Sequence, residues 1–108
     1  MTTHELMTHD PAIVTPGDSI AHAAQLMRHF DVGMLPVIDD IHHRRLAGVI
    51  TDRDIVIRCL AEADLTDCRI GDHMSKDALT TVTPSTPVEE VAAQMERFQV
   101  RRLPVVDT

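Results

Sequence analysis

The sequence has 108 residues, of which 44% are hydrophobic, and this predicts one compact globular module rather than a disordered chain. Its 10 Lys and Arg residues are outnumbered by 17 Asp and Glu residues, and the formal net charge of −7 argues against nucleic-acid binding, which needs a cationic field. There is no apolar run of about 18 residues and no signal-peptide stretch at the N-terminus, so we expect a cytoplasmic protein that does not bind membranes.

The chain has no Trp or Tyr, and its two phenylalanines are Phe30 and Phe98. Its core must therefore be aliphatic, and the ring stacking that often binds nucleic-acid bases is scarce. The two cysteines, Cys59 and Cys68, do not form a CxxC motif, and we expect Cys59 to be a small buried hydrophobic residue.

One segment of the chain occurs twice. Residues 14–39 align without a gap with residues 82–107 at an offset of 68, and 11 of the 26 aligned positions are identical. The identities include both phenylalanines and both Leu-Pro-Val triplets, Leu35-Pro36-Val37 and Leu103-Pro104-Val105. A repeat of this length indicates that each copy is one supersecondary unit.

The first copy begins with a predicted strand over residues 12–14 and a Pro-containing turn. A helix follows with Asp18 at its N-cap, and its apolar residues recur at helical spacing: Ile20, Ala23, Ala24, Met27 and Phe30. Two short apolar strands are then predicted over residues 34–38 and 46–50. Thr51 opens a second helix that carries apolar residues at Ile55, Val56, Cys59 and Leu60.

The second copy repeats the first part of this order. We predict a strand over residues 79–82, then a helix with Thr86 at its N-cap, Pro87 at its first position and Glu89 completing a capping box. A strand over residues 103–106 follows. The given sequence has no counterpart of residues 41–62 in this copy, because Thr108 aligns with Asp40. The strand over residues 103–106 is then an uncovered apolar edge, so we expect a homodimer or support from another chain.

These residues carry a family resemblance. The chain combines a Thr-Pro pair before the first helix, the pattern V-x-x-LPV-x-D after it and the segment GVITDRDI at the second helix. The lead-ins Glu5-Leu6-Met7-Thr8 and Asp72-His73-Met74-Ser75 precede the two copies. Together they resemble the cystathionine-β-synthase-type (CBS) repeat. The resemblance implies an α+β (α/β) fold of tandem β-α-β-β-α repeats packed through their sheets, with a complete repeat in residues 1–68 and the N-terminal part of a second in residues 69–108.

The resemblance also implies a function. Paired CBS repeats form a regulatory module that often dimerises, binds an adenine ligand such as AMP, ATP, ADP or S-adenosylmethionine in an inter-repeat cleft, and acts on a partner protein. We therefore expect a nucleotide-sensing module that requires no cofactor. The alternative is a CBS-fold interaction and dimerisation scaffold without a working ligand site.

The candidate ligand site is the segment Gly48–Asp54, where a helix starts directly after a strand. We expect free backbone N–H groups there to favour an anion such as a phosphate, with the Thr51 hydroxyl and the Arg53 cation as additional partners. By resemblance, Thr51 and Asp54 match positions of the family that contact phosphate and ribose. The alternative is local, because Thr51 and Asp54 also fit a capping box.

Contacts to the base are expected from residues at the predicted strands over residues 12–14 and 34–38, namely Val14, Thr15, Gly33, Met34 and Leu35. Gly33 would let the backbone approach a ligand closely, or it is a plain turn glycine. In the second copy Arg101 and Arg102 stand where Gly33 and Met34 stand in the first. They either reach phosphates or are solvated charges.

Other patterns do not indicate chemistry. His4 and His9 are five residues apart rather than the four that share a helix face, and His42-His43 falls in a polar turn, so we expect no metal site. The sequence has no P-loop, no G-x-G-x-x-G and no G-x-S-x-G motif, so we expect no catalytic residues and no enzyme activity.

Overall fold

The structure is a computed structural model and describes residues 1–62, 68–75 and 80–107. The described residues belong to two compact units. The first-repeat unit is Pro11–Leu79, and the second-repeat unit combines Met1–Asp10 with Thr80–Thr108. None of the helices in the described ranges is long and apolar enough to cross a membrane.

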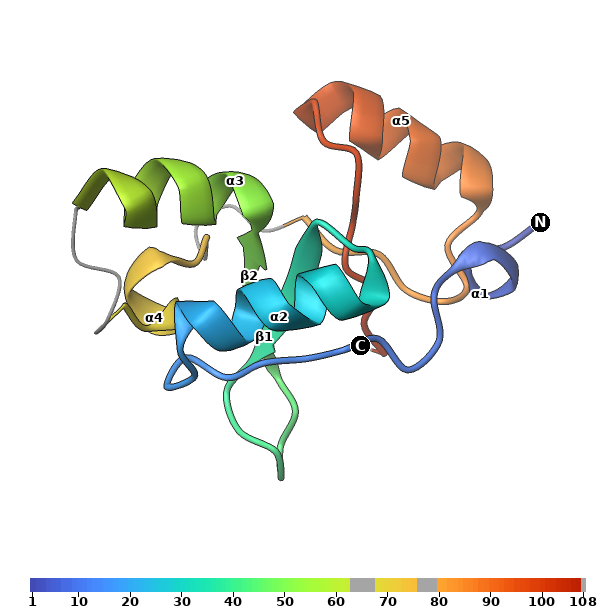
Figure 1. Ribbon diagram of the computed structural model, residues 1–108. Coiled ribbons are helices and arrows are strands. Elements are labelled where there is room, and N and C mark those ends of the chain that lie inside the picture. Colours follow the sequence, from blue (N-terminus) through green and yellow to red (C-terminus); the bar gives the residue numbers. More distant parts are fainter. Residues whose placement is uncertain (63–67, 76–79, 108) are drawn as a thin grey trace. The chain divides into compact units, whose positions relative to one another are not determined.

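The first-repeat unit contains a two-stranded sheet and the helices around it (Figure 1). The strands β1 and β2 pair antiparallel, with Met34 opposite Thr51 and an irregularity between Val37 and Ile38. The elements of this unit are α2 (Ile20–Phe30), β1 (Met34–Ile38), β2 (Leu46–Thr51), α3 (Asp52–Asp54), the π-helical turn η1 (Ile55–Cys59), the 3-10 turn η2 (Leu60–Glu62) and α4 (Ile70–His73).

The second-repeat unit contains α1 (Thr3–Leu6) and α5 (Val88–Phe98) (Figure 1). The strand predicted over residues 12–14 of the first-repeat unit and the strand predicted over residues 103–106 of the second-repeat unit are each reduced to a single bridge residue. Val14 forms a single parallel bridge with Val37, and Val82 forms the equivalent bridge with Val105. The strand predicted from residue 79 begins outside the described residues.

The two copies repeat the same backbone contacts, which confirms the internal repeat. The Val14 N–H donates to the Pro36 carbonyl at 3.1 Å, and the equivalent Val82 N–H donates to the Pro104 carbonyl at 3.1 Å. Helices α2 and α5 both end at a left-handed residue, Asp31 with φ 54° and Gln99 with φ 56°. A left-handed residue at this position satisfies the last carbonyls of a helix.

Each lead-in helix precedes one copy of the repeat in the sequence but packs against the other copy. Helix α4 precedes the second copy (residues 82–107) in the sequence but packs in the first-repeat unit, where the Gly71 N–H donates to the Pro16 carbonyl at 2.8 Å. Helix α1 precedes the first copy (residues 14–39) but packs in the second-repeat unit, where the His4 N–H donates to the Pro84 carbonyl at 2.9 Å. A Cβ atom on Gly71 would lie 3.0 Å from the Cβ of Pro16, so glycine permits this close approach.

The predicted helix caps are wrong by one residue. Ser19, not Asp18, caps α2, and its hydroxyl accepts from the His22 N–H at 3.1 Å. The Asp18 carboxylate instead accepts from the Thr15 N–H at 2.9 Å and closes the preceding turn. In the second copy Thr86 closes the same turn and Pro87 takes the N-cap position, so the predicted capping box with Glu89 does not form.

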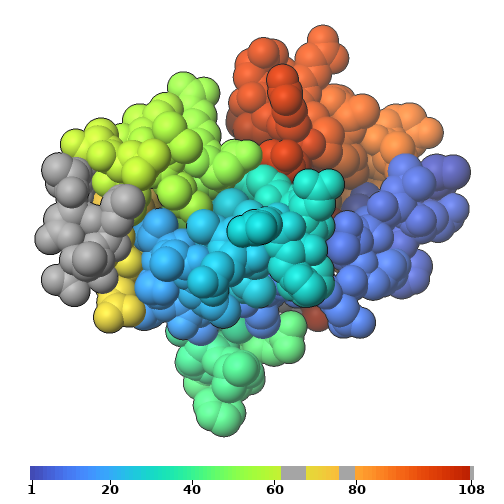
Figure 2. All heavy atoms as spheres, in the orientation of Figure 1, coloured from blue at the N-terminus to red at the C-terminus, as the bar shows by residue number. Residues whose placement is uncertain are grey.

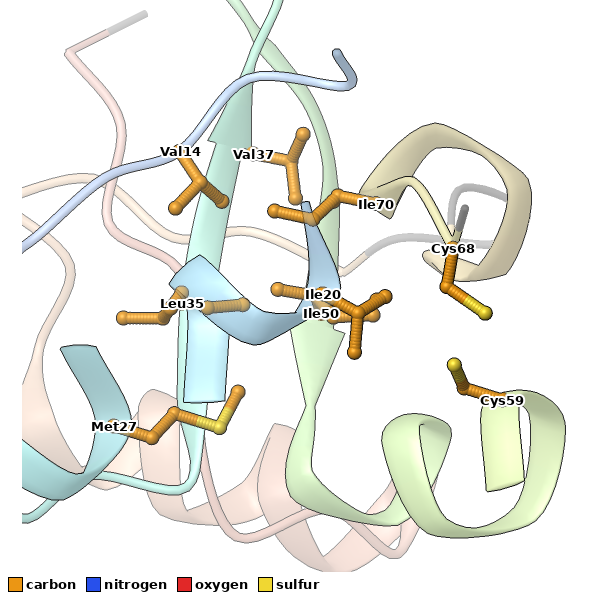
Figure 3. Close-up of a cluster of buried hydrophobic side chains, with 10 residues drawn as sticks. Val14, Ile20, Met27, Leu35, Val37, Ile50, Cys59, Cys68 and Ile70 are labelled. Carbon is orange, nitrogen blue, oxygen red and sulfur yellow. The ribbon is translucent and has the colours of Figure 1, made fainter. Parts of the chain in front are cut away.

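The hydrophobic core lies in the first-repeat unit and is aliphatic apart from its sulfur atoms (Figure 3). It consists of Val14, Ile20, Ala23, Met27, Leu35, Val37, Ile50, Cys59, Cys68 and Ile70. The expected burial of Cys59 is confirmed. The core is closed by β2 and η1, which contribute Ile50 and Cys59.

The second-repeat unit repeats only part of this core. Among its described residues Val82 and Thr3 are buried, and α5 has no buried residue. Its apolar side chains instead line a pocket whose walls include Leu6, Met7, Val88, Val91, Met95 and Leu103. The counterparts of Val88, Val91 and Met95 in the first-repeat unit are buried. The described residues of the second-repeat unit include no equivalent of Ile50 and Cys59 to cover them.

The repeat supplies a matched pair of mutations. Leu35 is 1% exposed, so Leu35→Ala should lower the free energy of unfolding by about 2–5 kcal/mol through lost burial and a cavity. Leu103, its counterpart, is only half-buried beside the pocket, so Leu103→Ala should cost clearly less. Urea unfolding of both variants measures the difference. Equal losses would show that the second-repeat unit has a complete core.

Candidate functional site

The junction between β2 and α3 brings several of the predicted site residues together. Met34 at the start of β1 lies opposite Thr51 at the end of β2, and the Asp52 N–H donates to the Gly33 carbonyl at 2.9 Å. Gly33 and Met34 therefore lie beside the residues that start the helix. We call this arrangement the β2–α3 junction.

Thr51 and Asp54 form a reciprocal capping box. The Asp54 N–H donates to the Thr51 hydroxyl at 3.0 Å, and the Thr51 N–H donates to the Asp54 carboxylate at 3.1 Å. The local alternative proposed from the sequence is therefore present in the structure. In this capping box the Thr51 hydroxyl oxygen accepts a hydrogen bond, so the hydroxyl proton can still be donated to another group.

The free backbone N–H groups expected at this helix start are not found. The Asp52 N–H is bonded to Gly33, the Arg53 N–H donates to the Asp52 carboxylate at 2.8 Å, and the Asp54 N–H is bonded to Thr51. This part of the prediction is wrong, because short polar side chains satisfy the first turn from within the chain. The groups of the junction that remain available to an anion are the exposed Arg53 side chain and the Thr51 hydroxyl proton.

Asp54 is buried and has partners beyond its own turn. Its carboxylate oxygens accept from the Ser75 hydroxyl at 3.3 Å, and the Arg58 Nε lies 3.7 Å from one of them. Ser75 also pairs with β2 through the backbone of Val49, at 2.8 and 2.9 Å. Asp54 therefore connects the junction to the segment that follows α4. The contact with Ser75 could not be read from the sequence, because the two residues are 21 positions apart.

Two of the residues predicted to contact the base have side chains in the core. Val14 and Leu35 are each 1% exposed, and both backbone groups of Val14 are already bonded, to Pro36 and Ile38. Their side chains therefore belong to the core and do not line a surface. Thr15 is half-buried, and its contact with a base stays a prediction.

Arg101 and Arg102 are exposed residues of the second-repeat unit. The structure does not bring them together with the junction within one unit. Their predicted contact with phosphates stays a prediction.

Sequence reasoning missed a cluster of potential metal ligands in the core of the first-repeat unit. Cys59, Cys68 and His73 are all buried, and one donor atom of each lies within 4.8 Å of the others. In the sequence, the spacings of nine and five residues between them match no common zinc motif. The one signal was that three metal-ligating residues occur within a short stretch.

A second group, Asp39, Asp40 and His43, lies in the turn between β1 and β2, which projects from the first-repeat unit (Figures 1 and 2). These residues organise the turn. The His43 ring nitrogen lies 2.9 Å from an Asp40 oxygen, and the hydrogen bonds from His43 lower the pKa of the Asp40 carboxyl. The Asp39 carboxylate accepts from the Arg45 N–H at 2.9 Å. His42 and His43 are exposed, as the sequence predicted.

Comparison with protein families matches this chain to the CBS domain over residues 4–60 and 70–108. Among curated relatives, Hypoxic response protein 1 of Mycobacterium tuberculosis (strain CDC 1551 / Oshkosh) is 34% identical over 105 residues, which cover 97% of this chain and 72% of the relative. The CBS domain-containing protein YhcV of Bacillus subtilis (strain 168) is 35% identical over 103 residues, covering 95% and 71%.

Solved structures match the whole fold. The crystal structure of Hypoxic Response Protein I, which has two coordinated zinc ions, matches with a TM-score of 0.85 at 34% identity and covers 99% of this chain and 85% of that one. The crystal structure of CBSX2 in complex with AMP has a TM-score of 0.81 at 31% identity and covers 99% and 82%. The CBS domain pair of protein MJ0100, in complex with 5-methylthioadenosine and S-adenosyl-L-methionine, has a TM-score of 0.85 at 27% identity and covers 99% and 81%.

The capping box generates a stability prediction. Thr51→Ala removes the acceptor for the Asp54 N–H and should lower the free energy of unfolding by about 1 kcal/mol. Thr51→Ser keeps the hydroxyl and should restore most of this loss. Chemical denaturation of the two variants measures how much the cap contributes to the free energy of unfolding. A serine variant as unstable as the alanine variant would mean that the Thr51 methyl group, not its oxygen, stabilises the junction.

Proposed function

Because this chain belongs to the CBS domain family, we propose that it is a non-catalytic regulatory module that binds an adenine nucleotide at the β2–α3 junction. The nucleotide is AMP, ADP, ATP or an S-adenosyl compound. Binding would change the packing of the module, and a partner protein would respond to that change.

The observation that carries this proposal is the arrangement of Thr51 and Asp54 beside Gly33 and Met34. Their hydrogen bonds fix both side chains at the end of β2 without a ligand. A preorganised site of this kind loses little conformational entropy when it binds. The AMP complex of CBSX2 and the S-adenosyl-L-methionine complex of MJ0100 support an adenine ligand in modules of the same fold.

If the ligand is AMP, ADP or ATP, its phosphate would contact Arg53 and Thr51. The Arg53 side chain is exposed, and a guanidinium group binds phosphate oxygens through charge-assisted hydrogen bonds. The Thr51 hydroxyl donates its remaining proton to the same group. These side chains replace the free N–H groups that the sequence had suggested.

The ribose hydroxyls would donate to Asp54. The Ser75 hydroxyl donates to this carboxylate in the structure. Its oxygen lies 3.3 Å from both carboxylate oxygens, which is longer than the usual 2.5–3.0 Å of an O–H···O bond. We infer that ribose hydroxyls replace Ser75 at Asp54. The base would then lie against the backbone near Gly33 and Met34 and against Thr15.

A scaffold without a ligand is the second candidate function. It is favoured by the fact that the first three N–H groups of the helix start are already bonded within the chain. In that case Thr51 and Asp54 serve only as a cap. Ligand binding separates the two candidates.

We also propose that the chain forms a homodimer through the apolar pocket of the second-repeat unit. The pocket is lined by Val88, Val91, Met95 and other apolar side chains whose counterparts in the other unit are covered. Burial of such a surface against a second copy would remove it from water.

Thermal unfolding with and without each adenine ligand tests nucleotide binding. A ligand that binds only the folded chain stabilises it by about 2.7 kcal/mol at 100 times its Kd. Arg53→Gln should weaken AMP binding by about tenfold or more, because it removes a charged hydrogen-bond donor without disturbing the cap. Arg28→Gln, at an exposed position of α2, is the matched control and should bind AMP as the unchanged chain does.

The outcomes decide between the two functions. A stabilisation by one adenine ligand that is reduced only in the Arg53 variant supports the proposed site. The absence of any shift with all four ligands would favour the scaffold. An equal shift in both arginine variants would place the nucleotide elsewhere on the chain.

The dimer has its own test. Light scattering should give twice the mass of the chain, and Val91→Glu should raise the dimer Kd by at least about tenfold, because it places a charge in the apolar pocket. Ala93→Glu, at an exposed position of the same helix, should leave the mass unchanged. A monomeric mass for the unchanged chain would refute the proposed dimer.

A further inference from the structure

Three metal-ligating side chains from separate segments meet in the core of the first-repeat unit. Cys59 is the last residue of η1, Cys68 lies two residues before α4, and His73 is the last residue of α4. They are 0%, 7% and 6% exposed. Figure 3 shows the sulfur atoms of Cys59 and Cys68 directed toward one another. The chain therefore gathers two thiols and one imidazole in an otherwise apolar region.

The donor atoms are nearly as close as a tetrahedral metal site requires. One donor of each residue lies within 4.8 Å of the other two. With zinc bonds of about 2.0–2.3 Å, the donors of a tetrahedral site are about 3.5–3.8 Å apart. The donors would have to move closer by about 1.0–1.3 Å at most, and rotation about χ1 of the cysteines and about χ1 and χ2 of the histidine would provide this movement.

The type of donor selects the metal. Thiolate and imidazole ligands favour zinc over magnesium or calcium, which prefer oxygen. On binding, each cysteine would release its proton to solvent and bind as a thiolate, while the histidine stays neutral. Two thiolates and Zn²⁺ then have no net charge. Such a neutral complex fits a core in which an uncompensated charge would be costly.

We propose that Cys59, Cys68 and His73 bind one zinc ion, with a fourth position left for water or an added ligand. This site is separate from the β2–α3 junction and does not depend on nucleotide binding. It would join the end of η1 to α4, and so hold the lead-in helix of the second repeat in the first-repeat unit. The exposed group in the β1–β2 turn carries no such proposal, because its carboxylates already organise the turn.

Cobalt titration of the reduced full chain tests the site, since Co²⁺ occupies zinc sites and reports its ligands by absorption. We expect one Co²⁺ per chain, an intense sulfur-to-cobalt charge-transfer band, and displacement of cobalt by added Zn²⁺. Cys59→Ser and Cys68→Ser should each weaken binding about hundredfold or more and reduce the band, because they remove ligands rather than outer partners. His73→Gln should weaken binding while keeping the thiolate band.

His43→Gln, in the exposed turn, is the matched histidine control and should bind cobalt as the unchanged chain does. Zinc should also raise the unfolding temperature of the unchanged chain but not that of the cysteine variants.

The proposal is overturned if the cobalt complex lacks a sulfur band, or if the cysteine variants bind as tightly as the unchanged chain. It is also overturned if the reduced chain takes up no metal. If a cysteine variant fails to fold, X-ray absorption of the unchanged chain with zinc decides. Two sulfur ligands support the site, and a shell of only nitrogen and oxygen excludes it.

Discussion

Two pairs of backbone hydrogen bonds determine how this chain is divided. Ile70 and Gly71 donate to the carbonyls of Asp18 and Pro16, at 2.9 and 2.8 Å, and at equivalent positions Thr3 and His4 donate to Thr86 and Pro84, each at 2.9 Å. Helices α1 and α4 have four residues each and would not be stable in isolation. They form because these bonds fix them against a partner repeat. The exchange of lead-ins is the reason that the spatial units do not coincide with the sequence repeats.

Both units receive a lead-in helix in the same way, so the difference between the two cores comes from the other elements that cover them. In the first-repeat unit α4 contributes Ile70 to the core, and β2 and η1 contribute Ile50 and Cys59. Among the described residues of the second-repeat unit, α1 supplies the equivalent of α4 but nothing corresponds to β2 and η1, and the side chains of α5 are partly exposed around a pocket. Identical local contacts thus produce one closed core and one open one. The difference lies in the cover that β2 and η1 provide, and the alignment of the two copies already indicated that the second copy has no counterpart of these residues.

Sequence patterns predicted the repeat, the helices α2 and α5, both strands of the sheet and the family. They were less reliable where a tertiary contact competes with local propensity. Asp18 and Thr86 are good caps by residue type, yet each closes the turn before its helix instead. At the site, the pattern predicted the positions of Thr51 and Asp54. It could not predict that Asp54 binds Ser75, since only the folded chain brings residues so distant in sequence together.

Asp54 links the proposed nucleotide site to the rest of the first-repeat unit. Its carboxylate takes part in the cap at Thr51 and also in the bond to Ser75, which follows α4 and pairs with Val49. If ribose replaces Ser75, the ligand and this segment compete for one carboxylate, and competition of this kind is a thermodynamic coupling in both directions. A zinc ion at His73 would hold the same lead-in two residues earlier. Ligand binding would then release Ser75 from Asp54 while the metal still holds the lead-in at His73.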